Sequence, residues 1–233
     1  EVVPDQVAAI LIEPVQGDGG FLPAPVAFMQ ALRDLTDRHG IVLIADEIQT
    51  GFGRTGKMFG FEHSNIQPDL VTVAKSLGGG LPISGVVGRT EIMQAPAPGG
   101  LGGTYGGSAL SCAAALAVLD IFADEQLLER GIAMGKRLET GLRRLQAKHP
   151  VIAEVRGQGP MLAIEFLKGP RVTPEDAALV QQVIDHCREA GLLVIKCGVY
   201  RNVIRFLAPL TTSDQQTDEA LEILANALSN ATH

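Results

Sequence analysis

The chain has 233 residues, of which 46% are hydrophobic and 19% are charged, a composition typical of a folded globular protein. Its formal net charge is −7, and its basic residues are scattered singly apart from Arg143 and Arg144, so we expect no nucleic-acid partner. The apolar runs are too short to span a bilayer, and the three cysteines lack disulfide or zinc-site spacing, so we expect a cytoplasmic protein without a structural metal.

The first half of the chain alternates short apolar runs with helical patterns. Apolar residues at helical spacing predict a helix over residues 25–39, which Gly40 ends. Strands are expected at residues 7–14, 41–45, 70–74 and 85–88. This rhythm indicates an α/β fold with a mostly parallel sheet.

The second half changes in character. Helices are expected at residues 109–122, 125–148, 174–190 and 213–228. Strands are expected at residues 151–155, 161–166, 192–195 and 203–207. We therefore expect residues 1–125 to form part of a large domain and residues 126–233 to form a smaller C-terminal α+β domain.

An acid and an amine end two neighbouring predicted strands. Asp46 follows residues 41–45, and Lys75 follows residues 70–74 and precedes three glycines. Ligands of open α/β sheets bind at the carboxyl ends of strands, and a lysine among apolar residues can lose its proton and act as a nucleophile. In this interpretation, Asp46 would pair with a cationic ring nitrogen, and the amine of Lys75 would form an imine. A helix cap at Asp46 and a solvated lysine at position 75 are the simpler alternatives.

Two further features suggest the binding of anions. A glycine-rich segment at residues 99–108 contains Thr104 and opens into a predicted helix, which is favourable for binding phosphate, although such runs are often only flexible loops. Arg205 lies within an apolar strand, where it needs a carboxylate partner. That partner is either a substrate carboxylate or an internal acid such as Asp18 or Glu165.

The longest motif is LIADEIQTGFGRTG at residues 43–56, followed by Pro68-Asp69 and by Ala74-Lys75-Ser76 with its three glycines. Together with EPVQG at residues 13–17, these stretches resemble the class III (subgroup II) aminotransferases, pyridoxal-phosphate enzymes of fold type I. The resemblance covers essentially the whole chain. Residues 97–105, 197–205 and 209–211 make it most similar to the 4-aminobutyrate aminotransferases.

The resemblance implies cofactor roles for five residues. Lys75 would bind pyridoxal 5′-phosphate covalently and then move a proton during the reaction. Asp46 would keep the pyridine nitrogen protonated, Gln49 would contact the phenolic oxygen of the ring, and Ile48 would pack on one ring face. Thr104 would bind the cofactor phosphate of a neighbouring subunit, so the implied active unit is a homodimer.

The resemblance also implies a reaction. The enzyme would move an amino group from 4-aminobutyrate, or a related ω-amino donor, to 2-oxoglutarate, giving succinate semialdehyde and glutamate. Arg205 would bind the α-carboxylate of the acceptor. Asp18 stands where the 4-aminobutyrate enzymes carry a glutamate that pairs with this arginine, and its side chain is one methylene shorter, which puts that gating in question. The alternatives are ornithine, acetylornithine or diaminobutyrate aminotransferase, or a non-catalytic fragment of such an enzyme.

The chain departs from the family in length, because members are nearly twice as long. The absent N-terminal portion would carry a phosphate-binding turn, the aromatic residue that stacks on the ring, and another substrate-binding arginine. We therefore expect residues 1–233 alone to bind the cofactor weakly and to turn over negligibly.

Overall fold

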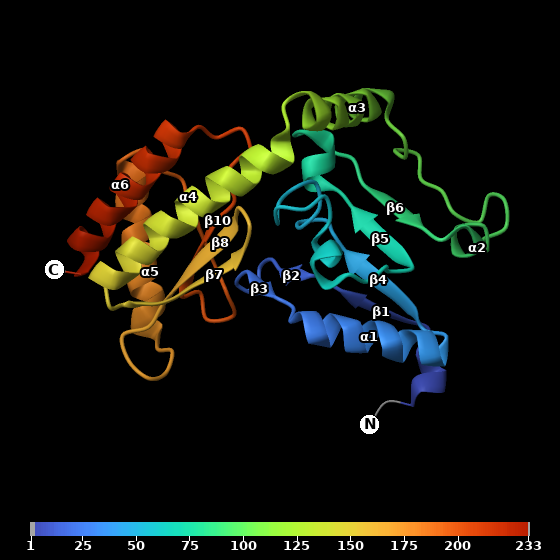
Figure 1. Cartoon of the computed structure of the whole chain (residues 1–233), viewed down its shortest axis with the longest axis horizontal. Coiled ribbons are helices and arrows are strands. Elements are labelled where there is room, and N and C mark those ends of the chain that lie inside the picture. The colour runs from blue at the N-terminus through green and yellow to red at the C-terminus, as the bar shows by residue number, and fades with distance from the viewer. Residues whose placement is uncertain (1–2, 233) are drawn as a thin grey trace. The chain divides into compact units, whose positions relative to one another are not determined.

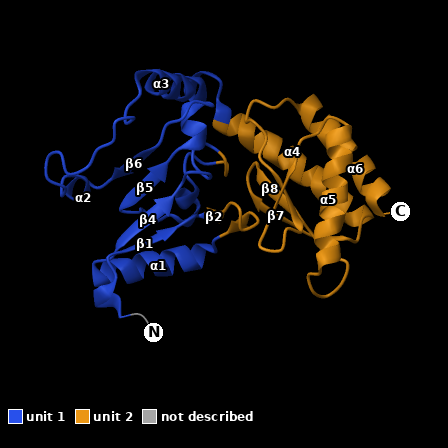
Figure 2. Cartoon of the chain, turned by 180° about the vertical axis from the view of Figure 1, so that it is seen from behind, with its two compact units in different colours: residues 1–14, 24–53, 57–127 blue, residues 15–23, 54–56, 128–233 orange. Residues whose placement is uncertain are grey.

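The computed structural model describes residues 3–232, which form two compact units (Figures 1 and 2). Among the described residues, unit 1 comprises residues 3–14, 24–53 and 57–127, and unit 2 comprises residues 15–23, 54–56 and 128–232. Two short segments from the first quarter of the chain thus group with the C-terminal half. The division into domains at residues 125 and 126 stays a prediction, because compact units need not coincide with domains.

Unit 1 is built on a four-stranded sheet in the order β1-β4-β5-β6. The strands are β1 (Ala9–Ile12), β4 (Val42–Asp46), β5 (Leu70–Val73) and β6 (Gly85–Gly88). The first three are parallel, and β6 is antiparallel to β5. A mostly parallel sheet was expected, and the strand bounds agree with the apolar runs to within two residues.

Helix α1 (Val26–His39) follows residues 15–23, leads into β4 and packs against it (Figure 1). Pro25 occupies its N-cap, where the missing N–H costs nothing, and Gly40 ends it with a left-handed φ of 63°. Met29 is the buried apolar residue of the helix, with 1% of its surface exposed. The helix therefore packs through a narrow face and leaves the other side to solvent.

The remainder of unit 1 is more open. Short helix α2 (Thr90–Met93) follows β6, and the chain then reaches helix α3 (Ala109–Asp124). Three 3-10 turns accompany these elements, η1 (Pro4–Gln6), η2 (Gly60–Ser64) and η3 (Lys75–Gly78). Over residues 3–232, no helix is both long enough and apolar enough to cross a membrane.

Unit 2 contains a second, antiparallel sheet in the order β7-β8-β10-β9 and a two-stranded hairpin. The strands are β7 (Ile152–Gln158), β8 (Met161–Phe166), β9 (Ile195–Cys197) and β10 (Val203–Phe206), with β2 (Val15–Gln16) and β3 (Leu22–Pro23) in the hairpin. The helices are α4 (Leu127–Lys148), α5 (Pro174–Glu189) and α6 (Asp214–Thr232). The strand expected at residues 192–195 is wrong by three residues, and the hairpin was not expected.

The main core of unit 2 lies between this sheet and its helices. Residues such as Ile164, Phe166, Val183 and Leu224 are fully buried within it. A smaller cluster joins the hairpin to the sheet, in which Val15 and Phe21 pack with residues of β8, β9 and β10. The hairpin is therefore held by apolar burial as well as by its own short ladder.

Candidate active site

Asp46 is the last residue of β4 and lies beside Thr72 of the parallel strand β5. Its Oδ1 accepts a hydrogen bond from the Thr72 hydroxyl at 3.0 Å and another from the N–H of Ile48 at 3.1 Å. Within residues 3–232, both hydrogen bonds of the Asp46 side chain thus end on one oxygen. Oδ2 remains available to a ligand that carries an N–H or a positive charge.

Lys75 lies two residues beyond the end of β5 and begins η3. Its φ of 43° lies in the left-handed region, which costs a non-glycine residue about 1–3 kcal/mol. Since β4 and β5 are parallel, Asp46 and Lys75 leave the sheet at the same end, as the sequence predicts. The lysine is exposed, so its amine is accessible to a ligand.

The turn that follows Asp46 carries the next two candidate residues, Ile48 and Gln49. Both are partly buried. The Oε1 atom of Gln49 is buried and has no hydrogen-bond partner among the described residues. A buried amide without a partner is costly, and the two ends of the amide exchange by a half-turn, so Gln49 can offer either a donor or an acceptor. The Gln49 amide, Asp46 Oδ2 and the Lys75 amine together fit pyridoxal phosphate. This cofactor needs an acid at its ring nitrogen, an amine at its aldehyde and a polar contact at its phenolic oxygen.

The buried side chain of Glu47 fixes the turn that follows Asp46. Its side chain is fully buried and accepts hydrogen bonds from the N–H of Gly60 and of Phe61, both at 2.8 Å, and from the Thr50 hydroxyl. Burial raises the pKa of Glu47 above its usual value, and these three hydrogen bonds oppose that effect. Glu47 therefore ties the turn after Asp46 to the segment at Gly60 and Phe61.

Thr104 lies in the exposed segment before α3. Turns in this segment are closed by hydrogen bonds from Gly100 N–H to Ala97 O at 2.8 Å and from Gly106 N–H to Gly103 O at 3.0 Å. The helix begins at Ala109, as expected. The structure does not bring Thr104 into a hydrogen bond with the other candidates, so its role toward a neighbouring subunit stays a prediction.

Arg205 and Asp18 meet within unit 2. Arg205 Nη1 donates to Asp18 Oδ1 at 2.7 Å, and the guanidinium lies 5.9 Å from the centre of the Phe21 ring. The Arg205 side chain is 19% exposed and that of Asp18 is 91% exposed. The N–H of Gly198 donates to the Asp18 carbonyl at 2.9 Å and anchors the hairpin. The shorter side chain of aspartate therefore still reaches the arginine.

Glu165, the other acid considered for Arg205, is paired elsewhere. Arg156 forms ion pairs with Glu165 and with Glu154, and its Nε donates to the Gly20 carbonyl at 2.8 Å. Arg156 thus holds the hairpin that carries Asp18 against the sheet that carries Arg205. The sequence offered no signal for this residue beyond its charge within a strand.

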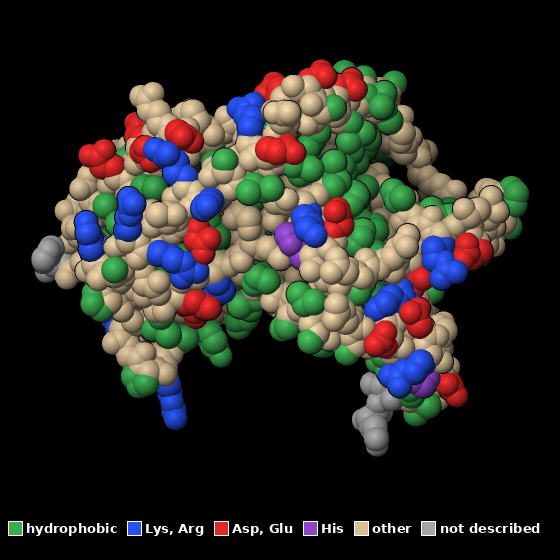
Figure 3. Space-filling model, in the orientation of Figure 1, with side chains coloured by type: hydrophobic (Ala, Val, Ile, Leu, Met, Phe, Trp, Pro, Cys, Tyr) green, Lys and Arg blue, Asp and Glu red, His purple; other side chains and the backbone are tan. Residues whose placement is uncertain are grey.

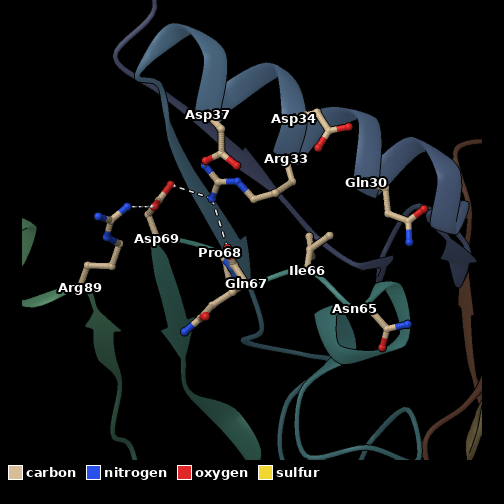
Figure 4. A pocket seen from close by; sticks show the side chains of 10 residues that line it. All are labelled: Gln30, Arg33, Asp34, Asp37, Asn65, Ile66, Gln67, Pro68, Asp69 and Arg89. Carbon is tan, nitrogen blue, oxygen red and sulfur yellow. Dashed lines mark hydrogen bonds and ion pairs between the residues drawn. The ribbon is translucent and has the colours of Figure 1, made fainter.

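A cavity of about 480 Å³ lies at the amino end of β5, lined by residues of α1 and of the loop before β5 (Figure 4). Asp69 accepts hydrogen bonds there from Arg33, from Arg89 and from the Leu43 N–H, at 2.8 to 3.0 Å. Burial acts to raise the pKa of Asp69, but these bonds outweigh it and the pKa lies below its usual value. Lys75 follows the opposite end of β5, so this cavity is no part of the candidate site.

Two residues of the site were missed from the sequence. The apolar run at residues 70–74 predicts a strand and no role for Thr72, although a hydroxyl among Leu70, Val71 and Val73 is a visible exception. Phe21 was not considered, and its φ of 55° and full burial under Arg205 follow from tertiary structure.

Solved structures similar to the chain define the fold as type I of the pyridoxal-phosphate enzymes. An ornithine aminotransferase from Toxoplasma gondii aligns with a TM-score of 0.88 at 33% identity, over 98% of this chain and 52% of that one. An S-selective transaminase from Arthrobacter sp. aligns with a TM-score of 0.89 at 32% identity, again over 98% and 52%. The expected fold class is confirmed.

The model of the family described as aminotransferase class III matches residues 1–228, and the chain belongs to this family. It is 58% identical over 222 residues to the 5-aminovalerate aminotransferase DavT of Pseudomonas aeruginosa, covering 95% of this chain and 52% of that protein. It is 48% identical over 231 residues to the 4-aminobutyrate aminotransferase GabT of Escherichia coli, covering 99% and 54%. The chain spans about half the length of these relatives. Class III aminotransferases depend on pyridoxal phosphate, which confirms the cofactor expected for the family.

Proposed function

We propose that the chain carries the lysine and the ring-binding acid of a transaminase that moves an amino group from an ω-amino acid to 2-oxoglutarate. This proposal is supported by one observation above all: Asp46 ends β4 and Lys75 follows the neighbouring parallel strand β5, so both lie at the same edge of the sheet. The donor is 4-aminobutyrate or 5-aminovalerate, since relatives of both names are 48% and 58% identical to this chain over the aligned residues.

Each residue of unit 1 has a separate task in this proposal. Lys75 binds the cofactor through Nζ and afterwards carries a proton to and from the substrate. Asp46 keeps the ring nitrogen protonated through Oδ2, Gln49 contacts the phenolic oxygen, and Ile48 packs on the ring. When bound, pyridoxal phosphate supplies a protonated pyridine that withdraws electrons from the substrate carbon. The cost of the strained backbone at Lys75 supports such a role, because strain of this kind is retained where function requires it.

Substrate recognition falls to unit 2. The Arg205 guanidinium can bind a carboxylate through two hydrogen bonds, and its Nη1 already donates to Asp18. An acceptor such as 2-oxoglutarate brings an α-carboxylate that competes with Asp18 for the arginine. An ω-amino donor has no α-carboxylate at its reacting carbon and leaves the Asp18 pair intact. The exposure of Asp18 supports this exchange, since an exposed acid is displaced at little cost.

We further propose that the active unit is a cytoplasmic homodimer, with Thr104 directed to the cofactor phosphate of the second copy. Apolar side chains gather on α3, directly after the Thr104 segment (Figure 3). Leu110 is 71% exposed and Leu116 is 63% exposed. Exposed apolar residues on one helix are typical of an interface, and three free cysteines suit a reducing compartment.

The proposal is tested by adding pyridoxal phosphate to residues 1–233 and recording visible absorbance, with Lys75→Ala as the paired control. We expect weak binding with a band that requires Lys75 and that decays when 4-aminobutyrate or 5-aminovalerate is added. Ornithine and diaminobutyrate, added in parallel, separate the alternative donors. A folded chain whose spectrum is the same with and without Lys75 would instead indicate a non-catalytic fragment.

The dimer is tested separately by sedimentation of the wild type and of Leu116→Glu. We expect the wild type to sediment as a dimer and the variant as a monomer, because a buried charge without a partner disrupts an apolar interface. Equal masses of about one chain for both proteins would contradict the homodimer.

A further inference from the structure

Thr72 lies in an apolar strand, yet its hydroxyl and its carbonyl are both hydrogen-bonded to the segment that holds the ring-binding acid. Its hydroxyl donates to Asp46 Oδ1 at 3.0 Å, and its carbonyl accepts a hydrogen bond from the N–H of Glu47 at 3.0 Å. The two strands are in register at this point, with Asp46 beside Thr72. One residue of β5 therefore fixes both the backbone after Asp46 and its side chain.

We propose that Thr72 is a positioning residue that holds the Asp46 carboxylate so that Oδ2 faces the ring nitrogen of the cofactor. This inference rests on the proposed function. The hydroxyl and the Ile48 N–H together fill Oδ1 and restrict rotation of the carboxylate, which leaves Oδ2 as its open acceptor. Thr72 stands three residues before Lys75, so the acid and the amine are both set by β5.

Strand propensity alone does not explain a threonine here. Valine has the same shape and a similar preference for strands, and Val71 and Val73 flank the position. What threonine adds is a donor next to a carboxylate, and hydrogen bonds to charged groups are the stronger ones. Thr72→Val is therefore a nearly isosteric change that removes the donor and little else, and Thr72→Ser restores the donor.

The hydrogen bond itself is measured without cofactor, by urea unfolding of wild type, Thr72→Val, Asp46→Asn and the double variant. We expect the two changes to be non-additive by a factor of about 5 in the unfolding constant, since Thr72→Val removes the hydrogen bond and Asp46→Asn replaces its charged acceptor with a weaker neutral one. Thr140→Val makes the same chemical change at an exposed helical position and should show no coupling to Asp46→Asn. Additive effects of Thr72→Val and Asp46→Asn would overturn the proposed contact.

The positioning role is measured by titrating pyridoxal phosphate into the same proteins and following the visible band that requires Lys75. We expect Thr72→Val to weaken binding roughly 10-fold and to shift the pH at which the band changes, because the ring nitrogen is no longer held by a fixed carboxylate. Thr72→Ser should recover both properties. A purely structural role would change the affinity without moving the pH midpoint.

The outcomes distinguish the two proposals. A wild-type chain without a lysine-dependent band contradicts the proposed function, and this inference fails with it. A normal wild-type band that Thr72→Val leaves unchanged in affinity and pH midpoint contradicts the role of Thr72 alone. A weakened and shifted band in Thr72→Val, recovered in Thr72→Ser, supports both.

Discussion

Removing the buried carboxylate of Glu47 should destabilise the loops around the candidate site more than any exposed acid does. In Glu47→Ala, the N–H groups of Gly60 and Phe61 lose their acceptor. Each unsatisfied buried donor costs about 1–3 kcal/mol, so the two together cost about 2–6 kcal/mol. Relief of the desolvated carboxylate returns part of this cost, and we expect a net loss of about 2–4 kcal/mol. Glu47→Gln keeps one acceptor oxygen and should lose about 1–2 kcal/mol.

The assay is urea unfolding followed by circular dichroism, with Glu222→Ala on the exposed side of α6 as the control. The control should lie within about 0.5 kcal/mol of wild type, because exposed substitutions away from special contacts are nearly neutral. A Glu47→Ala protein as stable as that control would refute the reasoning, since the three hydrogen bonds would then contribute nothing.

The pH dependence gives a second test of Glu47. Burial raises its pKa in the folded protein, so the folded state binds the proton more tightly than the unfolded chain, whose glutamate pKa is about 4.3. Wild type therefore loses stability as pH rises from that value through the raised folded pKa. The glutamine in Glu47→Gln does not titrate, so the difference in the free energy of unfolding between this variant and the more stable wild type should become smaller over this pH range. A deficit that widens with pH would mean that the carboxylate prefers its charged form.

Three further predictions concern stability measured by urea unfolding. The pKa of Asp69 is lowered in the folded protein, so the ionised side chain stabilises the fold fully above the unfolded pKa of about 3.9, and this stabilisation is lost as pH falls through the folded pKa. Asp69→Asn should therefore lower the free energy of unfolding by about 3 kcal/mol at neutral pH and by less near pH 3. An alanine Cβ at Gly159 would lie 2.4 Å from a backbone oxygen, whereas at Gly40, which shares a positive φ, it meets nothing within 4 Å. Gly159→Ala should therefore cost at least about 3 kcal/mol and Gly40→Ala about 1 kcal/mol, and equal costs would contradict this account. Asp18→Asn should change stability by less than about 0.5 kcal/mol because its side chain is 91% exposed, while Arg205→Ala should cost about 1–2 kcal/mol.

The elements that local patterns specify were predicted well. Helix α1 agrees with the expected range to one residue because its apolar spacing, its proline and its terminal glycine act within the element. β8 begins and ends as expected, since its residues are almost all buried and form one apolar run. Asp46 and Lys75 could be placed together because parallel strands end at a common edge, which is a rule of topology and not of sequence distance.

The elements that depend on distant partners were not predicted. β9 is fixed by its pairing with β10, in which Cys197 lies opposite Val203, and this register overrides the apolar run that precedes it. The hairpin of β2 and β3 has two residues in each strand, too few to form a pattern. Its stability comes from burial of Phe21 and from Arg156, neither of which the local sequence reveals.

The partner of Arg205 shows why an ion pair cannot be assigned from charge alone. Arg205 lies opposite Ala163 on β8, and Val203 lies opposite Glu165, so Glu165 is the diagonal neighbour of the arginine. Arg156, also opposite Ala163 but on β7, takes that acid instead. Arg205 is left to Asp18, which is 187 residues away in the chain.

Asp69 and Asp46 lie at opposite ends of the same sheet, and comparing them shows how a structural carboxylate differs from a functional one. Asp69 directly precedes β5 and uses both oxygens, which accept from two arginines and a backbone N–H and leave little capacity for a ligand. Asp46 ends β4, and the donors that the described part of the chain offers it both bind Oδ1. Both residues are acids beside apolar strands, so composition and position do not distinguish them. The two aspartates differ in whether one carboxylate oxygen is still free to accept a hydrogen bond from a ligand. At Asp46, the Thr72 hydroxyl binds Oδ1 and so leaves Oδ2 free, a role that valine, which suits the strand equally well, could not fill.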